Sequence, residues 1–111
     1  MMIKGVHVGR DGLVEVREIA GGLKSLYEVT NCDIIDIAVR FVNGKPFDFV
    51  CDDEGLFKDN QFVSVFSKTH GIEIVGDVFI CTHDGGDLRS LSDNDIAHIL
   101  GSVEHGMVMT D

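Results

Sequence analysis

The segment from Cys81 to Asp87 carries residue types that bind metals and perform nucleophilic catalysis. Cys81 and His83 are two positions apart, so on a strand they would share one face, and a thiolate with an imidazole suits zinc. A structural zinc site needs four ligands, and the chain has no Cys-x-Cys, Cys-x-x-Cys or His-x-x-His pair to complete one. We therefore expect Cys81 to be an ordinary buried residue and predict no metal and no cofactor.

Cysteine–histidine catalysis requires an activated thiolate with a histidine within reach. The three cysteines, Cys32, Cys51 and Cys81, are odd in number and widely spaced, so they indicate neither a disulfide framework nor a zinc ribbon. Cys51 falls on the predicted core face of a strand, and Cys32 follows a predicted helix end. We expect all three thiols to be reduced and packed rather than reactive, and we predict no catalytic residue.

A group of carboxylates near the middle of the chain has the composition of a cation site: Asp48, Asp52, Asp53, Glu54 and Asp59. A calcium loop needs glycine at its sixth position and glutamate at its twelfth, but counting from Asp52 these positions hold Phe57 and Val63. Adjacent acids on a strand also point to opposite faces, so at most two would converge. We expect a solvated turn, with a weak Mg²⁺ or Ca²⁺ site as the alternative.

Asp36 and Arg40 lie on either side of Ala38 and share the polar face of a predicted strand. Arg40 could clamp an anionic ligand, or it could pair with Asp36 or with Asp48 across a hairpin. We expect pairing, because surface ion pairs are common. The double glycines at 21–22 and 85–86 fit neither a phosphate loop nor a dinucleotide-binding signature.

The candidate binding residues are the charged side chains of these segments: Asp36, Arg40, Asp52, Asp53, Glu54, Asp84 and Asp87. The five histidines are expected to be exposed. Two of them, His98 and His105, are seven positions apart and are predicted to share roughly one face of the last helix.

The elements that must position these residues begin with an N-terminal hairpin over residues 3–19, turning at the cluster 9–12. A short helix is predicted from Leu23 to about Asn31, a residue type suited to the left-handed conformation that ends a helix. A central hairpin then alternates apolar and polar residues on both sides of Asn43-Gly44. A two-residue loop there would place Phe47 beside Arg40.

Burial is expected to decide the register of the central hairpin. A one-residue slip turns every side chain to the other face. We therefore predict a three-residue loop, residues 42–44, with Gly44 left-handed and Val39 opposite Phe47, which brings the large apolar side chains to one face.

The second half contains less regular signals. Residues 56–60 are predicted to be a turn or short helical loop, and residues 62–66 a strand or a helical turn. Residues 72–81 indicate a buried strand with Gly76 as a bulge or turn, followed by an exposed loop at 84–87. Ser92 can cap a helix that ends near Gly106, and residues 106–111 are predicted to be a tail. The sum is a single α+β domain, residues 1–111: a mainly antiparallel sheet (N-terminal hairpin, central hairpin, further strand) with two helices.

Charge is the most unusual feature of the composition. The 111 residues include nine basic and nineteen acidic side chains, a formal charge of −10. The first thirty residues hold four of each, so residues 31–111 carry the whole excess, with five basic and fifteen acidic groups. Such a surface argues against direct binding of nucleic acid or an anionic membrane. A macromolecular partner, if there is one, is expected to carry a basic patch, but the preferred interpretation of the acidity is that it keeps a small protein soluble. Neither a membrane-spanning run nor a signal peptide is present, so we expect a cytoplasmic protein.

Four segments carry a family resemblance: residues 31–37 with Arg40, residues 47–56, residues 75–81 and residues 88–96. Together they resemble a family of small domains of unknown function from Gram-positive bacteria, their plasmids and their phages. The resemblance covers most of residues 1–100. It implies a cytosolic protein, often carried on mobile elements, and implies no activity.

Two functions are compatible with these observations. The first is a protein-interaction module with an acidic surface, acting as an inhibitor or DNA mimic of a mobile element. The second is a small ligand-binding domain or enzyme that uses Asp36 and Arg40 or residues 81–87. The first is preferred, and the sequence predicts no particular oligomeric state.

Overall fold

Two sheets form the body of the protein. A computed structural model describes residues 1–55 and 62–110. The first sheet contains β1 (Met2–Val8), β2 (Val14–Ala20), β3 (Ile35–Val42), β4 (Lys45–Asp52), β7 (Val78–Asp84) and β8 (Asp87–Arg89). Its order is β2-β1-β7-β4-β3, with β8 paired to β7 and every pair antiparallel. The second sheet, in the order β6-β5-β10-β9, contains β5 (Val63–Ser67), β6 (Gly71–Val75), β9 (Val103–Glu104) and β10 (Met107–Thr110).

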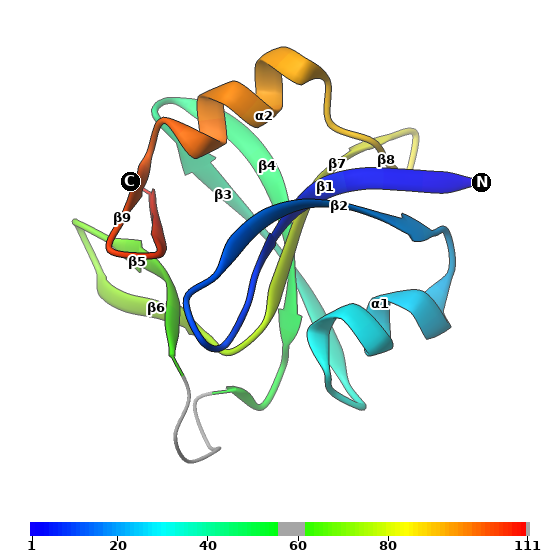
Figure 1. Cartoon of the computed structure of the whole chain (residues 1–111), viewed down its shortest axis with the longest axis horizontal. Coiled ribbons are helices and arrows are strands. Elements are labelled where there is room, and N and C mark those ends of the chain that lie inside the picture. Colours follow the sequence, from blue (N-terminus) through cyan, green and yellow to red (C-terminus); the bar gives the residue numbers. More distant parts are fainter. Residues whose placement is uncertain (56–61, 111) are drawn as a thin grey trace.

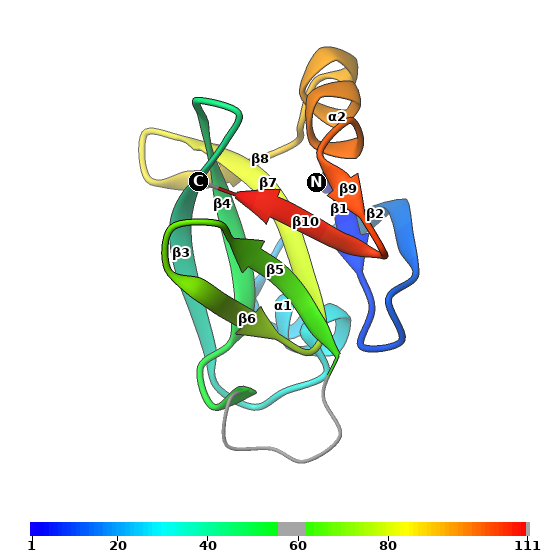
Figure 2. The same ribbon diagram turned by 90° about the vertical axis from the view of Figure 1, so that its left-hand side faces the viewer.

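The second sheet and the two helices cover the first sheet from both sides (Figures 1 and 2). One core lies between the two sheets and under α2 (Asp93–Leu100), and the other lies under α1 (Leu23–Thr30). The central strands are therefore buried on both faces: Phe49, Val50, Phe79 and Ile80 are all 0% exposed. The fold is α+β and mostly antiparallel, as expected, but its strands divide into two sheets.

The N-terminal hairpin and the first helix are confirmed. β1 and β2 pair from Met2 opposite Ala20 to Val8 opposite Val14, closed by a hydrogen bond from the Gly9 N–H to the Leu13 carbonyl (2.9 Å). α1 ends at Asn31, which adopts the left-handed conformation with φ of 52°. These features depend on neighbouring residues, which is why local signals were sufficient.

The predicted register of the central hairpin is wrong. β3 and β4 are joined by the two-residue turn Asn43-Gly44, and Arg40, not Val39, lies opposite Phe47. Asn43 and Gly44 both have positive φ (48° and 82°), as a type I′ turn requires. The burial argument failed because β4 is covered on both faces, whereas β3 is an edge strand on which Ile37, Val39 and Phe41 stay exposed.

The next predicted strand is in fact two strands in different sheets. β6 and β7 are separated at Gly76, whose φ of 87° allows the chain to leave one sheet and enter the other. Residues 63–67 form β5, which settles the choice between strand and helical turn. The turn or helical loop predicted for residues 56–60 lies outside the described residues.

The C-terminal predictions need two corrections. Ser92 caps α2 as expected, accepting a hydrogen bond from the Asp95 N–H, but the helix ends at Leu100 and not near Gly106. Residues 107–110, predicted to be a tail, form β10, which pairs in parallel with β5 and antiparallel with β9. Burial drives this pairing, because Val108 lies in the core between the sheets and is 0% exposed.

Candidate functional site

A hollow of about 170 Å³ lies between the β3–β4 hairpin and β6. Among the residues that the structure describes, its charged lining consists of Asp36, Arg40, Asp52, Asp53 and Glu73. These four carboxylates and one guanidinium give 1 − 4 = −3, so the described part of the lining is acidic. β3, β4 and the turn after β4 contribute four of these groups and β6 contributes Glu73, so the site exists only because the second sheet packs beside the hairpin.

The Arg40 guanidinium binds other groups of the same chain and does not extend into solvent to bind an anion. Its Nε pairs with Oε1 of Glu73, and its Nη1 donates a hydrogen bond to the Val39 carbonyl (2.9 Å). Glu73 also accepts a hydrogen bond from Thr110 Oγ1 (3.3 Å). The prediction that Arg40 pairs with Asp36 or Asp48 is therefore wrong, because its partner is Glu73. One carboxylate links β3, β6 and β10.

The turn after β4 is organised by its own backbone. Asp52 accepts a hydrogen bond from the Glu54 N–H (2.9 Å), which fixes the Asp52 carboxylate at the end of the strand. Asp53 donates its backbone N–H to the Ile34 carbonyl (2.9 Å), which ties the turn to the start of β3. These bonds hold Asp52 and Asp53 at the rim of the hollow.

The structure brings together four of the seven candidate binding residues. Asp36, Arg40, Asp52 and Asp53 share the hollow, while Glu54 is exposed beside it and does not line it. Asp84 and Asp87 lie opposite each other in the β7–β8 hairpin, outside the hollow. Sequence reasoning missed Glu73. Its position between Ile72 and Ile74 marks it as a polar residue of a strand, but nothing local indicates that β6 packs beside Arg40.

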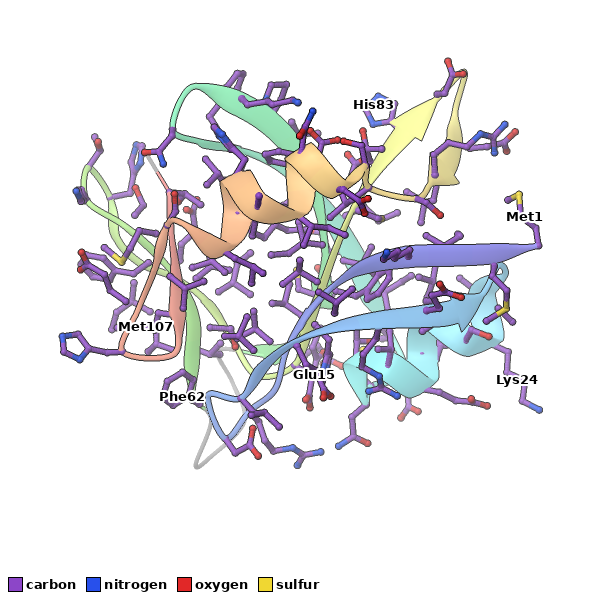
Figure 3. The ribbon with its side chains drawn as sticks, turned by 45° about the horizontal axis from the view of Figure 1, so that its top comes forward. Met1, Glu15, Lys24, Phe62, His83 and Met107 are labelled. Carbon is purple, nitrogen blue, oxygen red and sulfur yellow. The ribbon has the colours of Figure 1, made fainter. Side chains whose placement is uncertain are left out.

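In the segment from Cys81 to Asp87, His83 makes a hydrogen bond to a buried carboxylate. His83 Nδ1 lies 2.6 Å from Oδ2 of Asp48, which is 2% exposed. Figure 3 shows His83 near the end of β7. Asp48 was grouped with the acidic turn, but alternation along β4 turns it to the face away from the hollow. Across residues 1–55 and 62–110, no group of three or more His, Cys, Asp or Glu side chains is placed to hold a metal ion.

The thiols of Cys51 and Cys81 are protonated. Burial raises the pKa of the Cys81 thiol to about 12, and the Asp48 carboxylate adds to the effect. Burial, followed by the Asp36 carboxylate, raises the pKa of Cys51 to about 12. A nucleophilic cysteine needs the opposite shift. All three cysteines are free and buried.

Two predictions about histidines are wrong. His7, expected to be exposed, is 8% exposed, and its ring lies between Glu15 (Nδ1 to Oε1, 3.8 Å) and Asp77 (Nε2 to Oδ1, 3.3 Å). Glu15 is labelled in Figure 3. His98 and His105 do not share a helix face, because α2 ends before His105. Instead, His98 Nε2 lies 2.5 Å from the Val42 carbonyl and ties α2 to the central hairpin.

The Asp48–His83 pair gives the first testable prediction. In a double-mutant cycle with Asp48→Asn and His83→Ala, we expect a coupling energy of about 1 kcal/mol in the free energy of unfolding at pH 7. The value is modest because the His83 side chain is 55% exposed, which lets solvent screen the interaction. Urea denaturation of the four proteins measures it.

The matched control is the Asp87–Arg89 pair, whose charged atoms are 3.9 Å apart at the surface. Its coupling should be below about 0.5 kcal/mol. Equal coupling in the two cycles would show that the burial of Asp48 does not strengthen its bond to His83.

Comparison with known proteins supplies a family but no activity. A family model described as a domain of unknown function (DUF3846) matches residues 3–104. No curated protein and no solved structure matches the chain. Neither of the helices in the described residues is long and apolar enough to cross a membrane.

Proposed function

The chain belongs to the family of domains of unknown function DUF3846, and on that premise we propose that it is a protein-interaction module whose acidic hollow binds a basic segment of a partner protein. The observation that carries the proposal is the set of carboxylates that two sheets bring together: Asp36, Asp52, Asp53 and Glu73. Arg40, which pairs with Glu73, is the one basic side chain among the described residues that line the hollow, so a lysine or arginine from a partner would add complementary charge there.

The size of the hollow favours a side chain over a metabolite. Its volume of about 170 Å³ is below the roughly 300–1,000 Å³ typical of small-molecule pockets. A single long basic side chain, with its charged end among the carboxylates, fits such a space. The alternative of a ligand-binding domain or enzyme is less favoured, because Arg40 is engaged by Glu73 and the Cys81 thiol is protonated.

The charge of the whole chain would assist the encounter. A formal charge of −10 attracts a basic protein over several ångströms and raises the association rate at low ionic strength. Inhibition follows if the captured basic segment is one that the partner uses to bind nucleic acid. A role as a DNA mimic is a special case of this proposal, and the clustering of carboxylates in one hollow favours capture of one segment over imitation of a long phosphate row.

The test compares two variants of equal charge. Asp52→Asn with Asp53→Asn removes two charges from the hollow, and Asp84→Asn with Asp87→Asn removes two from the β7–β8 hairpin. The tagged protein captures partners from an extract of the source cells at low and high ionic strength, mass spectrometry identifies them, and titration of the purified partner measures affinity. We expect a basic partner that salt releases, with at least about tenfold weaker binding to the hollow variant and nearly unchanged binding to the hairpin variant.

Three results would contradict the proposal: a partner that is not basic, equal losses in the two variants, or no loss in either. Equal losses would assign the effect to net charge and not to the hollow. Asparagine keeps the acceptor oxygen that the Glu54 N–H uses, so the hollow variant should retain the fold.

A further inference from the structure

β3 is an edge strand with an uncovered row of apolar side chains. It ends the first sheet, and it has neither a bulge nor a proline to protect its free edge. Ile37, Val39 and Phe41 point away from the hollow and are 45%, 47% and 49% exposed. Natural sheets protect long edges from pairing with other chains, so an edge that lacks a bulge and a proline and carries an exposed apolar row favours a strand-pairing surface.

The backbone groups at this edge are oriented for pairing. The two-residue turn makes Val42 and Lys45 the closing hydrogen-bonded pair of the hairpin, and such pairs alternate along an antiparallel ladder. The N–H and C=O groups of Ile37 and Val39 therefore point away from β4, toward the free edge. A hollow of about 380 Å³ beside β3 is lined by Val39 and Phe41 and by His70 of the β5–β6 turn.

We propose that the strand that covers this edge is β3 of a second copy of the chain, antiparallel to the first and related to it by a two-fold axis at Ala38. In this register Ile37 lies opposite Val39 of the second copy, and Ile35 lies opposite its Phe41. On one face the two apolar rows combine into one. On the other face Asp36 of each copy lies opposite Arg40 of the other, so two Asp36–Arg40 pairs form across the axis.

Charge selects this register from its neighbours. A shift of one residue would set inward-pointing backbone groups against outward-pointing ones, which breaks the ladder. A two-fold axis at Ile37 would place Asp36 opposite Ala38, and an axis at Val39 would place Arg40 opposite Ala38. Among these three registers only the axis at Ala38 pairs both charges, so the strand is complementary to its own copy.

Arg40 can serve both the fold and the dimer. Its guanidinium has five donors, so it can keep Glu73 while it binds Asp36 of the second copy. The Val39 carbonyl, which now accepts from Arg40 Nη1, would accept a backbone N–H of the added strand. Asp52 and Asp53 belong to β4 and the turn after it, not to β3. The dimer therefore leaves both carboxylates in the acidic hollow.

The expected dimer is weak. An interface of one strand pair falls at or below about 1,200 Å², the lower limit of stable complexes, and the two chains carry −10 each. We expect a dissociation constant in the micromolar range, tightened by salt that screens the net repulsion. Sedimentation equilibrium over a range of concentrations measures it.

Charge reversal tests the register. We expect Asp36→Arg and Arg40→Asp each to weaken self-association at least about tenfold, because each places like charges opposite one another twice. An equal mixture of the two variants should dimerise again, because every pair across the axis then unites opposite charges. Failure of the mixture to associate overturns the register, and a wild-type protein that stays monomeric at high concentration overturns the dimer.

A second pair of variants tests the dimer without changing Arg40, whose replacement also removes its pair with Glu73. Val39→Lys adds a charge to the apolar row, whereas Leu23→Lys adds the same charge to an α1 side chain that is 56% exposed. Only Val39→Lys should abolish the dimer, with circular dichroism unchanged in both. Equal effects of the two variants would refute pairing at β3. The result is independent of the partner proposed for the hollow, since Asp52 and Asp53 are unaltered.

Discussion

Replacement of Val108 by aspartate is expected to unfold the protein at 25 °C. Val108 is 0% exposed, in the core between the two sheets, beside β5 and β9. A buried carboxylate without a partner costs about 3–5 kcal/mol or more, which is comparable to the whole stability of a small domain. Far-ultraviolet circular dichroism and urea denaturation measure the loss.

Met109→Asp is the matched control for this substitution. Met109 is the next residue of β10, so its side chain points to the other face, where it is half-buried. It should reduce the free energy of unfolding by a smaller amount and leave a folded protein. A Val108→Asp protein as stable as the wild type would mean that residues 107–110 are dispensable, as a tail would be.

Stability is expected to fall steeply above about pH 9. Folding raises the pKa of Cys51 and of Cys81 from 9.0 to about 12. Between these values the unfolded chain has lost protons that the folded chain keeps, so the unfolded state is favoured as pH rises. Each thiol contributes a slope of up to about 1.4 kcal/mol per pH unit, and the two together up to about 2.7 kcal/mol. Below about pH 9 their contribution is constant.

Urea denaturation at a series of pH values from 8 to about 10.5 checks this slope. The double variant Cys51→Ala with Cys81→Ala should lose most of it, while Cys32→Ala keeps both thiols and should retain it. In the native protein at neutral pH, a thiol reagent should modify Cys51 and Cys81 only as fast as the chain opens. Identical slopes in the double variant and the control would show that the two thiols do not cause the alkaline loss.

The candidate site was partly visible in the sequence. The sequence places Asp36 and Arg40 on the first strand of the central hairpin and Asp52 and Asp53 at the end of its second strand, and the structure places all four around the hollow. Glu73 was not predicted, because its meeting with Arg40 spans 33 positions and depends on how the sheets pack. Asp48 shows the converse: alternation along the strand predicts a polar face for it, yet that face of β4 is covered too, and Asp48 is buried beside His83.

Local chemistry determined the parts of the fold that neighbouring residues can specify: the first hairpin, the left-handed end of α1 at Asn31 and the cap of α2 at Ser92. The Asn43-Gly44 turn was also specified locally, and the error came from assuming that its hairpin has one buried face. Only the tertiary structure decided that β4 is covered on both sides and that β3 stays at an edge. It also decided that the last residues pair with β5, far away in the chain. Such contacts join segments with no shared local signal, and they form because each buries apolar surface that its own neighbours cannot cover.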